Sequence, residues 1–254
     1  MVKAQESNPI RLRPTTEKSI GTTAFFRNRP LYEVLFSELK SLGKPHYKIL
    51  FHACSIGAEV YSFVIRYALG GYISDFTIEV YATDLEPGFV EYSRNGQYPS
   101  EILGGMNEDE RSFFVLTCSD VSVVPDLKQA VTFVDACSYV DFETEHTFDV
   151  VLLLNTLIYV REDQQAVAID KVSKYNESIL VTSAFHTNSI ECDLKRNGYK
   201  PVTKQQREIH DAWTDRRVTE TSSELAPGIF ANWRLPEFSE IEAFEYKYGA
   251  IFRK

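Results

Sequence analysis

The most regular alternation of apolar and polar residues lies in the first third of the chain. Residues 48–53, with three consecutive large apolar side chains, are predicted to form a buried strand, and residues 77–82 a second strand. Between them, apolar side chains recur at helical spacing over 60–68, and a Gly-Gly pair follows where such a helix would end. Strand, helix and strand in this order predict the first half of a doubly wound α/β sheet.

The same alternation continues towards the end of the chain. Residues 148–154 are continuously apolar, as a buried parallel strand should be. Residues 199–209 and 244–252 are predicted to pair as antiparallel strands, which completes a seven-stranded, mostly parallel sheet with an antiparallel last strand. The other elements expected are helices over 30–40, 161–175 and 188–197 and a strand over 178–184.

The length of the chain predicts one large domain with local additions. Residues 1–20 are polar and contain two prolines, so they are expected to form an irregular N-terminal arm, with the domain over 21–254. A small inserted subdomain is expected at about 97–130. A second insert, at about 210–240, is expected before the last strand, where it would either shape substrate access or pack as a surface flap.

The end of the second strand carries the first candidate for ligand chemistry. Asp84 lies at the sheet edge where α/β proteins bind ligands, and a carboxylate there can accept two hydrogen bonds from a ribose diol. The preceding turn has one glycine, Gly57, instead of the G-x-G-x-x-G of dinucleotide sites, and Glu59 would repel a phosphate at the helix N-terminus. S-adenosylmethionine (SAM), which has an adenosine and positive charge but no phosphate, fits both features. Glu59 alone is equally well explained as a residue that favours the helix dipole.

Several sequence blocks, in a fixed order, resemble one enzyme family. Residues 53–62 read A-C-S-I-G-A-E-V-Y-S, which resembles the A-x-S-T-G-E-E-P-Y-S signature of the chemotaxis-receptor glutamate O-methyltransferase (CheR-type) family. The other blocks are residues 23–27, similar to T-x-F-F-R, residues 82–85, similar to A-T/S-D-I, and residues 148–160, similar to F-D-x-I-x-C-R-N-V-L-I-Y-F. The resemblance spans roughly residues 21–185.

The resemblance implies a class I SAM-dependent methyltransferase with a Rossmann-like fold. It implies catalytic roles for Arg27, which would hold a carboxylate of SAM or of the acceptor, and for Tyr159, which would position an acceptor oxygen. Without the resemblance, Arg27 would be interpreted as a surface arginine and Tyr159 as an aromatic packed beneath the next helix. The residues implied to bind the cofactor are Thr23, Arg27, Ala53, Cys54, Glu59, Asp84, Asp135, Cys137, Ser138, Leu154 and Asn155.

The chain also departs from the family pattern. Leu154 stands where the family has arginine, and residues 137–138 replace an asparagine-leucine pair expected at the adenine. The base would then be held by backbone groups or by Asp135. The loop after Ala184 differs from the family's G-H-S-E, and the short polar stretch before Thr23 is not the family's helical docking domain, so receptor docking by that route is not implied.

Composition narrows the classes of partner. A formal net charge of −9 argues against binding to a nucleic-acid backbone. The four cysteines show no C-x-x-C spacing and are expected to be free thiols in a reducing cytoplasm. No signal peptide and no metal-ligand cluster are recognisable, and the most apolar run, residues 150–160, is too short to cross a membrane.

Three hypotheses about function follow. An ionised carboxylate needs alignment but no general base to accept a methyl group, and no histidine is convincingly placed as a base, so an O-methyltransferase with a protein carboxylate as acceptor comes first. The second hypothesis keeps the cofactor but assigns a small molecule or a sugar as acceptor. The third is a SAM-binding regulatory protein without catalysis.

Overall fold

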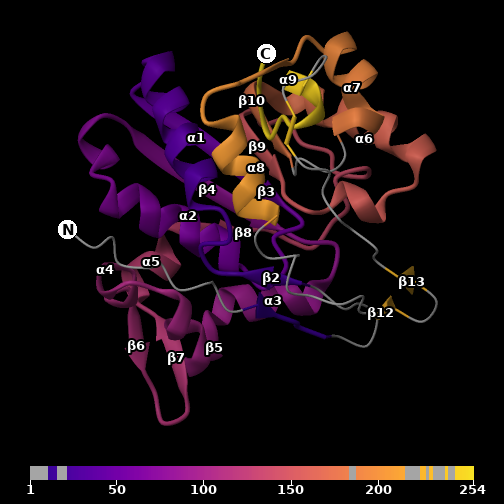
Figure 1. The fold of residues 1–254 in the computed structure, drawn as a ribbon. Coiled ribbons are helices and arrows are strands. Elements are labelled where there is room, and N and C mark those ends of the chain that lie inside the picture. The colour runs from indigo at the N-terminus through magenta and orange to yellow at the C-terminus, as the bar shows by residue number, and fades with distance from the viewer. Residues whose placement is uncertain are drawn as a thin grey trace.

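A seven-stranded sheet forms the centre of the computed structural model, which describes residues 11–15, 22–182, 187–214, 224–226, 229–230, 238–239 and 244–254. The strand order is β11-β14-β10-β9-β3-β4-β8 (Figure 1). Neighbouring strands from β10 to β8 are parallel, whereas β14 is antiparallel to both β10 and β11. The strands are β3 (His46–His52), β4 (Thr77–Thr83), β8 (Val131–Phe133), β9 (Phe148–Leu153), β10 (Asn176–Thr182), β11 (Lys200–Pro201) and β14 (Ile251–Arg253). The predicted sheet, with its antiparallel last strand, is confirmed.

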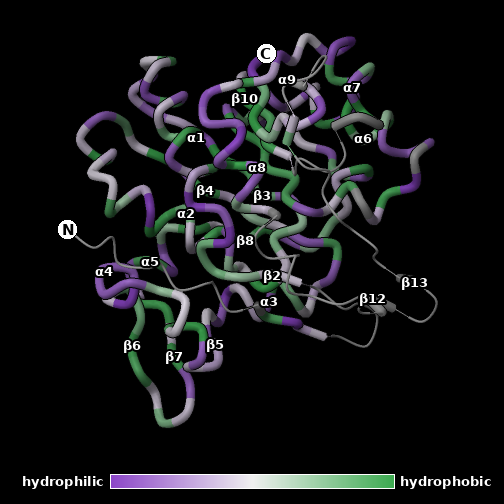
Figure 2. The backbone as a smooth tube through the Cα atoms, viewed as in Figure 1, coloured by the Kyte–Doolittle hydropathy of each residue, from purple (hydrophilic) through white to green (hydrophobic). Residues whose placement is uncertain are grey.

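Helices cover both faces of this sheet. Because alternate residues of a strand point to opposite sides, Phe51 packs into one core cluster with α1 and α2, and its neighbour Leu50 packs into another with α6 and α7. Hydrophobic residues concentrate along the central elements in Figure 2, and hydrophilic ones lie mostly at the periphery. The longer helices are α1 (Arg29–Leu42), α2 (Ala58–Leu69), α3 (Pro87–Asn95), α6 (Glu162–Tyr175), α7 (Thr187–Arg196) and α8 (Gln206–Thr214). The shorter ones are η1 (Tyr72–Ser74), η2 (Ser100–Gly105), α4 (Glu108–Arg111), α5 (Pro125–Gln129), η3 (Leu157–Tyr159) and α9 (Phe244–Lys247).

A small three-stranded antiparallel sheet projects from the main body, at the lower left of Figure 1. Its strands, in the order β5-β7-β6, are β5 (Gln97–Pro99), β7 (Asp120–Val123) and β6 (Phe114–Leu116). Tyr98 attaches it to the main body, because its hydroxyl donates to the carbonyl of Ile56 at 2.6 Å and its ring packs edge-on against Phe25. This unit lies within the inserted subdomain expected at about 97–130.

Two strand predictions near the C-terminus are largely wrong. Over 199–209 the strand β11 has only two residues, and the helix α8 follows because Gln206, Ile209 and Trp213 recur at helical spacing and are all buried. Over 244–252 the chain first forms α9, and only its last part pairs in the sheet as β14. The predicted 210–240 insert contains the end of α8 and the hairpin of β12 (Glu224–Ala226) with β13 (Ile229–Phe230), and its other residues lie outside the described ones except 238–239.

The N-terminal arm is not irregular throughout. Strand β1 (Arg11–Leu12) pairs antiparallel with β2 (Thr23–Ala24), which brings this part of the arm against the domain. Residues 1–10 and 16–21 of the expected arm lie outside the described residues. The helix predicted over 30–40 is confirmed as α1.

Candidate active site

The turn between β3 and α2 has an uncommon backbone conformation. Ala53, Ser55 and Gly57 have positive φ angles of 57°, 50° and 80°. Hydrogen bonds from Cys54 N to Thr83 O (3.0 Å) and from Gly57 N to Cys54 O (2.9 Å) hold the turn against the end of β4. Glycine is required at the last position, since a Cβ there would lie 2.9 Å from a serine hydroxyl of α3. Such strained turns persist where the surrounding structure fixes them, often at ligand sites.

Asp84 lies beside this turn, directly after β4. Its Oδ2 accepts a hydrogen bond from Ser55 N at 2.7 Å, and its Oδ1 accepts one from Glu86 N at 3.0 Å. Asp84 is 8% exposed, and burial raises the pKa of its carboxyl group above the usual range, although the backbone hydrogen bonds act in the opposite direction. Each carboxylate oxygen has a further lone pair, so Asp84 can accept both hydroxyls of a ribose.

Arg27 and Glu59 form a nearly buried ion pair next to the same turn. Arg27 donates to Glu59 Oε1 from Nε at 3.0 Å and from Nη2 at 2.5 Å, and the two side chains are 10% and 5% exposed. Thr23 Oγ1 donates to the other carboxylate oxygen of Glu59 at 3.5 Å. Three predicted site residues therefore form one polar unit, in which Glu59 is the partner of Arg27 as well as a residue of the first turn of α2.

The backbone around Arg27 is fixed from both sides. Phe26 has a φ of 50° and donates its N–H to Ser62 Oγ of α2 at 2.8 Å. On the other side, Asn28 caps α1, because its Oδ1 accepts from Leu31 N at 3.1 Å. The Nδ2 of the same side chain donates to the carbonyl of Ile209 in α8 at 2.9 Å. Arg27 thus lies at a junction of α1, α2 and α8.

Replacing Asn28 with alanine should destabilise the protein by about 2 kcal/mol, because the helix cap is lost and the Ile209 carbonyl loses its donor. Urea denaturation monitored by circular dichroism measures the change. Asn28→Ser is the matched variant, since it keeps a capping oxygen and removes the amide donor to α8 without adding a charge, so it should destabilise the protein less than Asn28→Ala does. Equal stability of Asn28→Ala and wild type would contradict this role.

Leu154, Asn155 and Tyr159 follow β9 at the same edge of the sheet. Leu154 is buried in the main core cluster, which explains an apolar residue at this position. Asn155 has a φ of 53°, a conformation that asparagine tolerates better than most residues. Tyr159 ends η3 and is 62% exposed, so it is not an aromatic packed beneath the following helix.

The loop after β8 brings residues 137–138 towards Asp84. It does not bring the carboxylate of Asp135 there. Cys137 N donates to the backbone carbonyl of Asp84 at 3.0 Å, and Ser138 Oγ accepts from the backbone N–H two residues later at 3.2 Å. The side chain of Asp135 is fully exposed and lies 3.9 Å from Arg94 Nη2. This position gives no support to Asp135 as the acceptor for an adenine amino group, and backbone groups of 137–138 are the other source of contacts.

Three residues at the site were not among those predicted. Ser55 Oγ is buried and has no hydrogen-bond partner within the described part of the chain, and Leu85, next to Asp84, is 70% exposed. Both stand inside the sequence blocks that resemble the family. Trp213 is 3% exposed, and its ring lies under the Arg27 guanidinium with Cζ 5.4 Å from the ring centroid. Its only signal in the sequence is the helical spacing of α8.

Two titratable groups near the turn are unsuited to proton transfer. Burial raises the pKa of the Cys54 thiol well above its usual range and lowers the pKa of His52 to about 3. His52 Nε2 lies 3.1 Å from the hydroxyl of Tyr175, on the side of the sheet that α6 covers. At neutral pH Cys54 is therefore a thiol and His52 a neutral, weakly basic imidazole.

The residues at this edge fit S-adenosylmethionine. Asp84 offers two acceptors for the ribose, the exposed Leu85 offers an apolar surface for the adenine, and Ser55 Oγ needs a partner. The Arg27–Glu59 pair offers both signs of charge for the methionyl ammonium and carboxylate, whereas Glu59 would repel a pyrophosphate. The fold and this site together define the SAM-binding domain of a class I methyltransferase.

Comparison with known families gives a more specific assignment. The family described as CheR methyltransferase, SAM binding domain, matches residues 21–179, more than half of the chain. The chain therefore belongs to the CheR methyltransferase family, and SAM is the cofactor of this domain.

Individual relatives agree with this assignment. A chemotaxis protein methyltransferase of Listeria innocua is 30% identical over 60% of this chain and 59% of its own length, and one of Listeria monocytogenes is 26% identical over 61% and 60%. The matches thus span about three fifths of these relatives. The putative methyltransferase Cher3 of Pseudomonas putida is 26% identical over 74% of this chain and 72% of its own length. Among solved structures, a magnesium protoporphyrin IX methyltransferase of Synechocystis covers 68% of this chain and 70% of its own, with 14% identity and a TM-score of 0.42.

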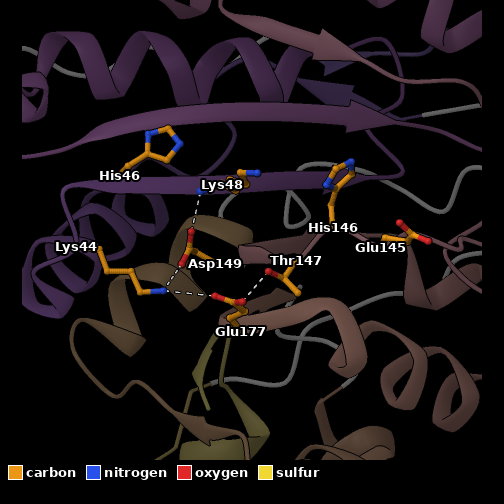
Figure 3. Close-up of a pocket in the computed structure, with 8 residues that line it drawn as sticks. All are labelled: Lys44, His46, Lys48, Glu145, His146, Thr147, Asp149 and Glu177. Atoms are coloured by element: carbon orange, nitrogen blue, oxygen red, sulfur yellow. Dashed lines mark hydrogen bonds and ion pairs between the residues drawn. The ribbon is translucent and has the colours of Figure 1, made fainter.

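A polar cavity of about 380 Å³ lies at the opposite, amino-terminal edge of the sheet (Figure 3). Lys44 Nζ lies 2.6 Å from Asp149 Oδ1 and 3.5 Å from Glu177 Oε2 within it. The hydrogen bond to Asp149 is the main reason why the pKa of Lys44 is raised. The residues that line it are Lys44, His46, Lys48, Glu145, His146, Thr147, Asp149 and Glu177. The cavity is separate from the SAM site, and its charges are largely paired with one another.

The part of the chain that the structure describes offers neither a metal-binding cluster nor a membrane-spanning helix. Across the described ranges, no cluster of three or more His, Cys, Asp or Glu side chains is suited to a metal ion. Within the same ranges, no helix has the length and apolar character needed to cross a membrane. All four cysteines are free thiols, as predicted.

Proposed function

We propose that this chain is a SAM-dependent O-methyltransferase whose acceptor is a carboxylate on a protein, a glutamate-like side chain. The observation that carries the proposal is the Arg27–Glu59 pair beside Asp84, near which the buried Cys54 thiol and His52 imidazole are unsuited as bases. The relatives named chemotaxis protein methyltransferase support a protein acceptor. Free cysteines support a cytoplasmic location for the reaction.

Methyl transfer to a carboxylate requires the protein mainly to align the acceptor with the methyl donor. When bound, SAM supplies a methyl group that its sulfonium already activates. Asp84 holds the ribose, and Arg27, held along one edge by Glu59, binds a carboxylate through its remaining N–H groups. Tyr159 donates a hydrogen bond that orients the acceptor oxygen. The acceptor carboxylate is ionised at neutral pH, so no group of the protein has to remove a proton.

The nature of the methylated product tests the class of acceptor. The protein is incubated with methyl-labelled SAM and either glutamate-rich proteins or small carboxylic acids. A methyl ester releases volatile methanol in mild alkali, whereas a methyl ether or a methylamine does not. We expect alkali-labile label on protein. Alkali-stable label would favour a hydroxyl or amine acceptor, label on small acids would favour a small-molecule enzyme, and cofactor binding without any transfer would favour a regulatory role.

Replacing Tyr159 with phenylalanine should lower kcat at least about tenfold, the lower end of the worth of one hydrogen bond to a charged group, and leave the affinity for S-adenosylhomocysteine within about twofold. Initial rates and calorimetric titration measure the two quantities. Tyr72→Phe is a matched control, because Tyr72 packs against Phe36 beside the amino-terminal end of β4, and it should change neither quantity. An unchanged kcat in Tyr159→Phe would remove this residue from the mechanism.

A further inference from the structure

We propose that Trp213 is a positioning residue that fixes the plane of the Arg27 guanidinium. The inference deepens the proposed function and rests on it, because it concerns the same site. Trp213 lies beyond residue 179, where the family match ends, so the family pattern does not supply it.

The contacts of Arg27 restrain its guanidinium in two directions. Glu59 binds one edge of the group through Nε and Nη2, and Nη1 donates to the Thr22 carbonyl at 3.4 Å, a long hydrogen bond that resists rotation of the group only weakly. The Trp213 ring lies 5.4 Å from Cζ, within the range of a cation–π interaction, and it covers one face of the group. An edge contact and a face contact together determine the plane. A carboxylate that binds a guanidinium needs that plane to be fixed, because its oxygens must lie in it.

Helix α8 is itself held in register with Arg27. Asn28, the next residue, donates to the Ile209 carbonyl at 2.9 Å, one turn before Trp213. On its other side α8 is attached to the C-terminal segment, because the His210 ring packs edge-on against Tyr248 and Gln206 Nε2 donates to Glu245 O at 2.6 Å. Since both sides are attached, the indole cannot move away from Arg27 without displacement of the whole helix.

Burial increases the strength of this arrangement. Trp213 is 3% exposed, and the side chains of Arg27 and Glu59 are 10% and 5% exposed, so little water competes for the guanidinium. A cation–π contact in such surroundings is stronger than one at the surface. Loss of the indole should therefore weaken whatever interaction Arg27 makes with a carboxylate by about tenfold.

The first test observes Arg27 directly and needs neither cofactor nor acceptor. The Nε–H resonance of Arg27 is assigned in nitrogen-15 NMR spectra by its absence in Arg27→Lys. In Trp213→Leu we expect this resonance to shift, since the ring current is lost, and to exchange faster with water. In Trp213→Phe, which keeps a ring, the exchange should stay close to wild type. An exchange rate unchanged in Trp213→Leu would overturn the proposal.

The second test is a double-mutant cycle between Trp213→Leu and Arg27→Lys. Trp213→Leu alone should weaken the interaction of Arg27 with a carboxylate about tenfold. If Arg27 holds the carboxylate of the cofactor, the affinity for S-adenosylhomocysteine falls; if it holds the carboxylate of the acceptor, the KM for the acceptor rises. In the Arg27→Lys background the same substitution should change that quantity less than twofold, because its effect passes through Arg27. Equal effects in both backgrounds would overturn the positioning role. Ile209→Ala is the control for general loosening of α8, since it removes buried volume and keeps the carbonyl that Asn28 binds.

The outcomes separate this inference from the proposed function. Coupling between Trp213 and Arg27 without methylation of any carboxylate would support the positioning role and contradict the function. Methylation of a carboxylate, together with effects of the two substitutions that simply add, would support the proposed function and contradict the positioning role. A folded wild type that binds no S-adenosylhomocysteine would contradict the function, and the Arg27 resonance alone would then decide the positioning role.

Discussion

Replacement of Asp84 with asparagine is expected to weaken the binding of S-adenosylhomocysteine about 100-fold and to leave the free protein no less stable than wild type. The ribose hydroxyls donate to an ionised carboxylate, and each hydrogen bond to a charged group contributes about 1.5–3 kcal/mol. An amide offers one oxygen in place of two and carries no charge. That oxygen can still accept from the backbone N–H of Ser55 or Glu86, so the turn should keep its shape.

The expected stability follows from the direction of the pKa shift of Asp84. Burial raises its pKa in the folded protein, so the folded state binds a proton more tightly than the unfolded state does. The resulting stabilisation of the folded protein is fully present at a pH below the pKa that Asp84 has in the unfolded state. It is lost as the pH rises through the pKa that Asp84 has in the folded state. At neutral pH the buried carboxylate therefore costs free energy, which asparagine avoids. Cofactor affinity should behave in the opposite way in wild type, rising with pH through the pKa of Asp84, and should lose this dependence in Asp84→Asn.

Calorimetric titration between pH 4 and pH 8 and thermal unfolding measure both effects. Asp149→Asn is the matched control, because Asp149 is also a largely buried aspartate that accepts a backbone N–H, from Lys48 at 2.8 Å, but it lies at the opposite edge of the sheet. It should reduce stability through loss of the Lys44 ion pair and leave cofactor affinity unchanged. An Asp84→Asn variant with wild-type affinity would exclude Asp84 from the cofactor site.

Arg27→Ala is expected to destabilise the protein by about 3 kcal/mol and to reduce methyl transfer about 1000-fold. The loss of stability arises because Glu59 is left buried with an uncompensated charge. The loss of transfer arises because both the binding of a carboxylate and its alignment depend on the guanidinium. Adding Glu59→Gln to Arg27→Ala should restore part of the stability without restoring transfer.

Arg29 provides the control for this prediction. It forms a comparable pair with Glu110, with contacts of 2.9 Å and 2.7 Å and side chains that are 11% and 0% exposed. Arg29→Ala should also destabilise the protein in urea denaturation, but less than Arg27→Ala because Arg66 Nη1 remains 3.8 Å from Glu110, and S-adenosylhomocysteine affinity should stay within about threefold of wild type. If both arginine variants lose transfer equally once stability is taken into account, Arg27 has no special role.

The parts of the fold that the sequence predicts are those where local pattern and tertiary packing agree. The run that forms β9 and the carboxyl-terminal half of β3 are apolar because they are buried on both faces of the sheet, so their composition identifies them. The stretch in which α8 begins was predicted to be a strand. Tyr199 and Lys200 begin a strand-like pattern, but the buried residues from Gln206 onward follow a helical period that is short and interrupted by polar side chains.

The site was predictable to a different degree. Asp84, Glu59 and Arg27 lie in recognisable sequence blocks, and the structure brings them together around one turn. The exposed position of the Asp135 carboxylate, 3.9 Å from Arg94 Nη2, could not be predicted, because the direction of a side chain after a strand depends on a loop conformation that no periodicity encodes. Trp213 could not be assigned to the site from sequence, since it reaches Arg27 across a separation of more than 180 residues through packing alone.

The attachment of α8 has a consequence for how the enzyme would lose activity on heating. The helix has nine residues, and its connection to α1 includes one side-chain hydrogen bond and one indole contact, whereas β3, β4 and β9 are joined by continuous backbone ladders. Detachment of α8 should therefore require less free energy than global unfolding. Amide hydrogen exchange in α8 should be faster than in β3, and inactivation should precede the loss of the far-ultraviolet circular dichroism signal. Because Arg27 loses its aromatic partner in this partly opened state, the protein would lose most of its activity while its sheet is still folded.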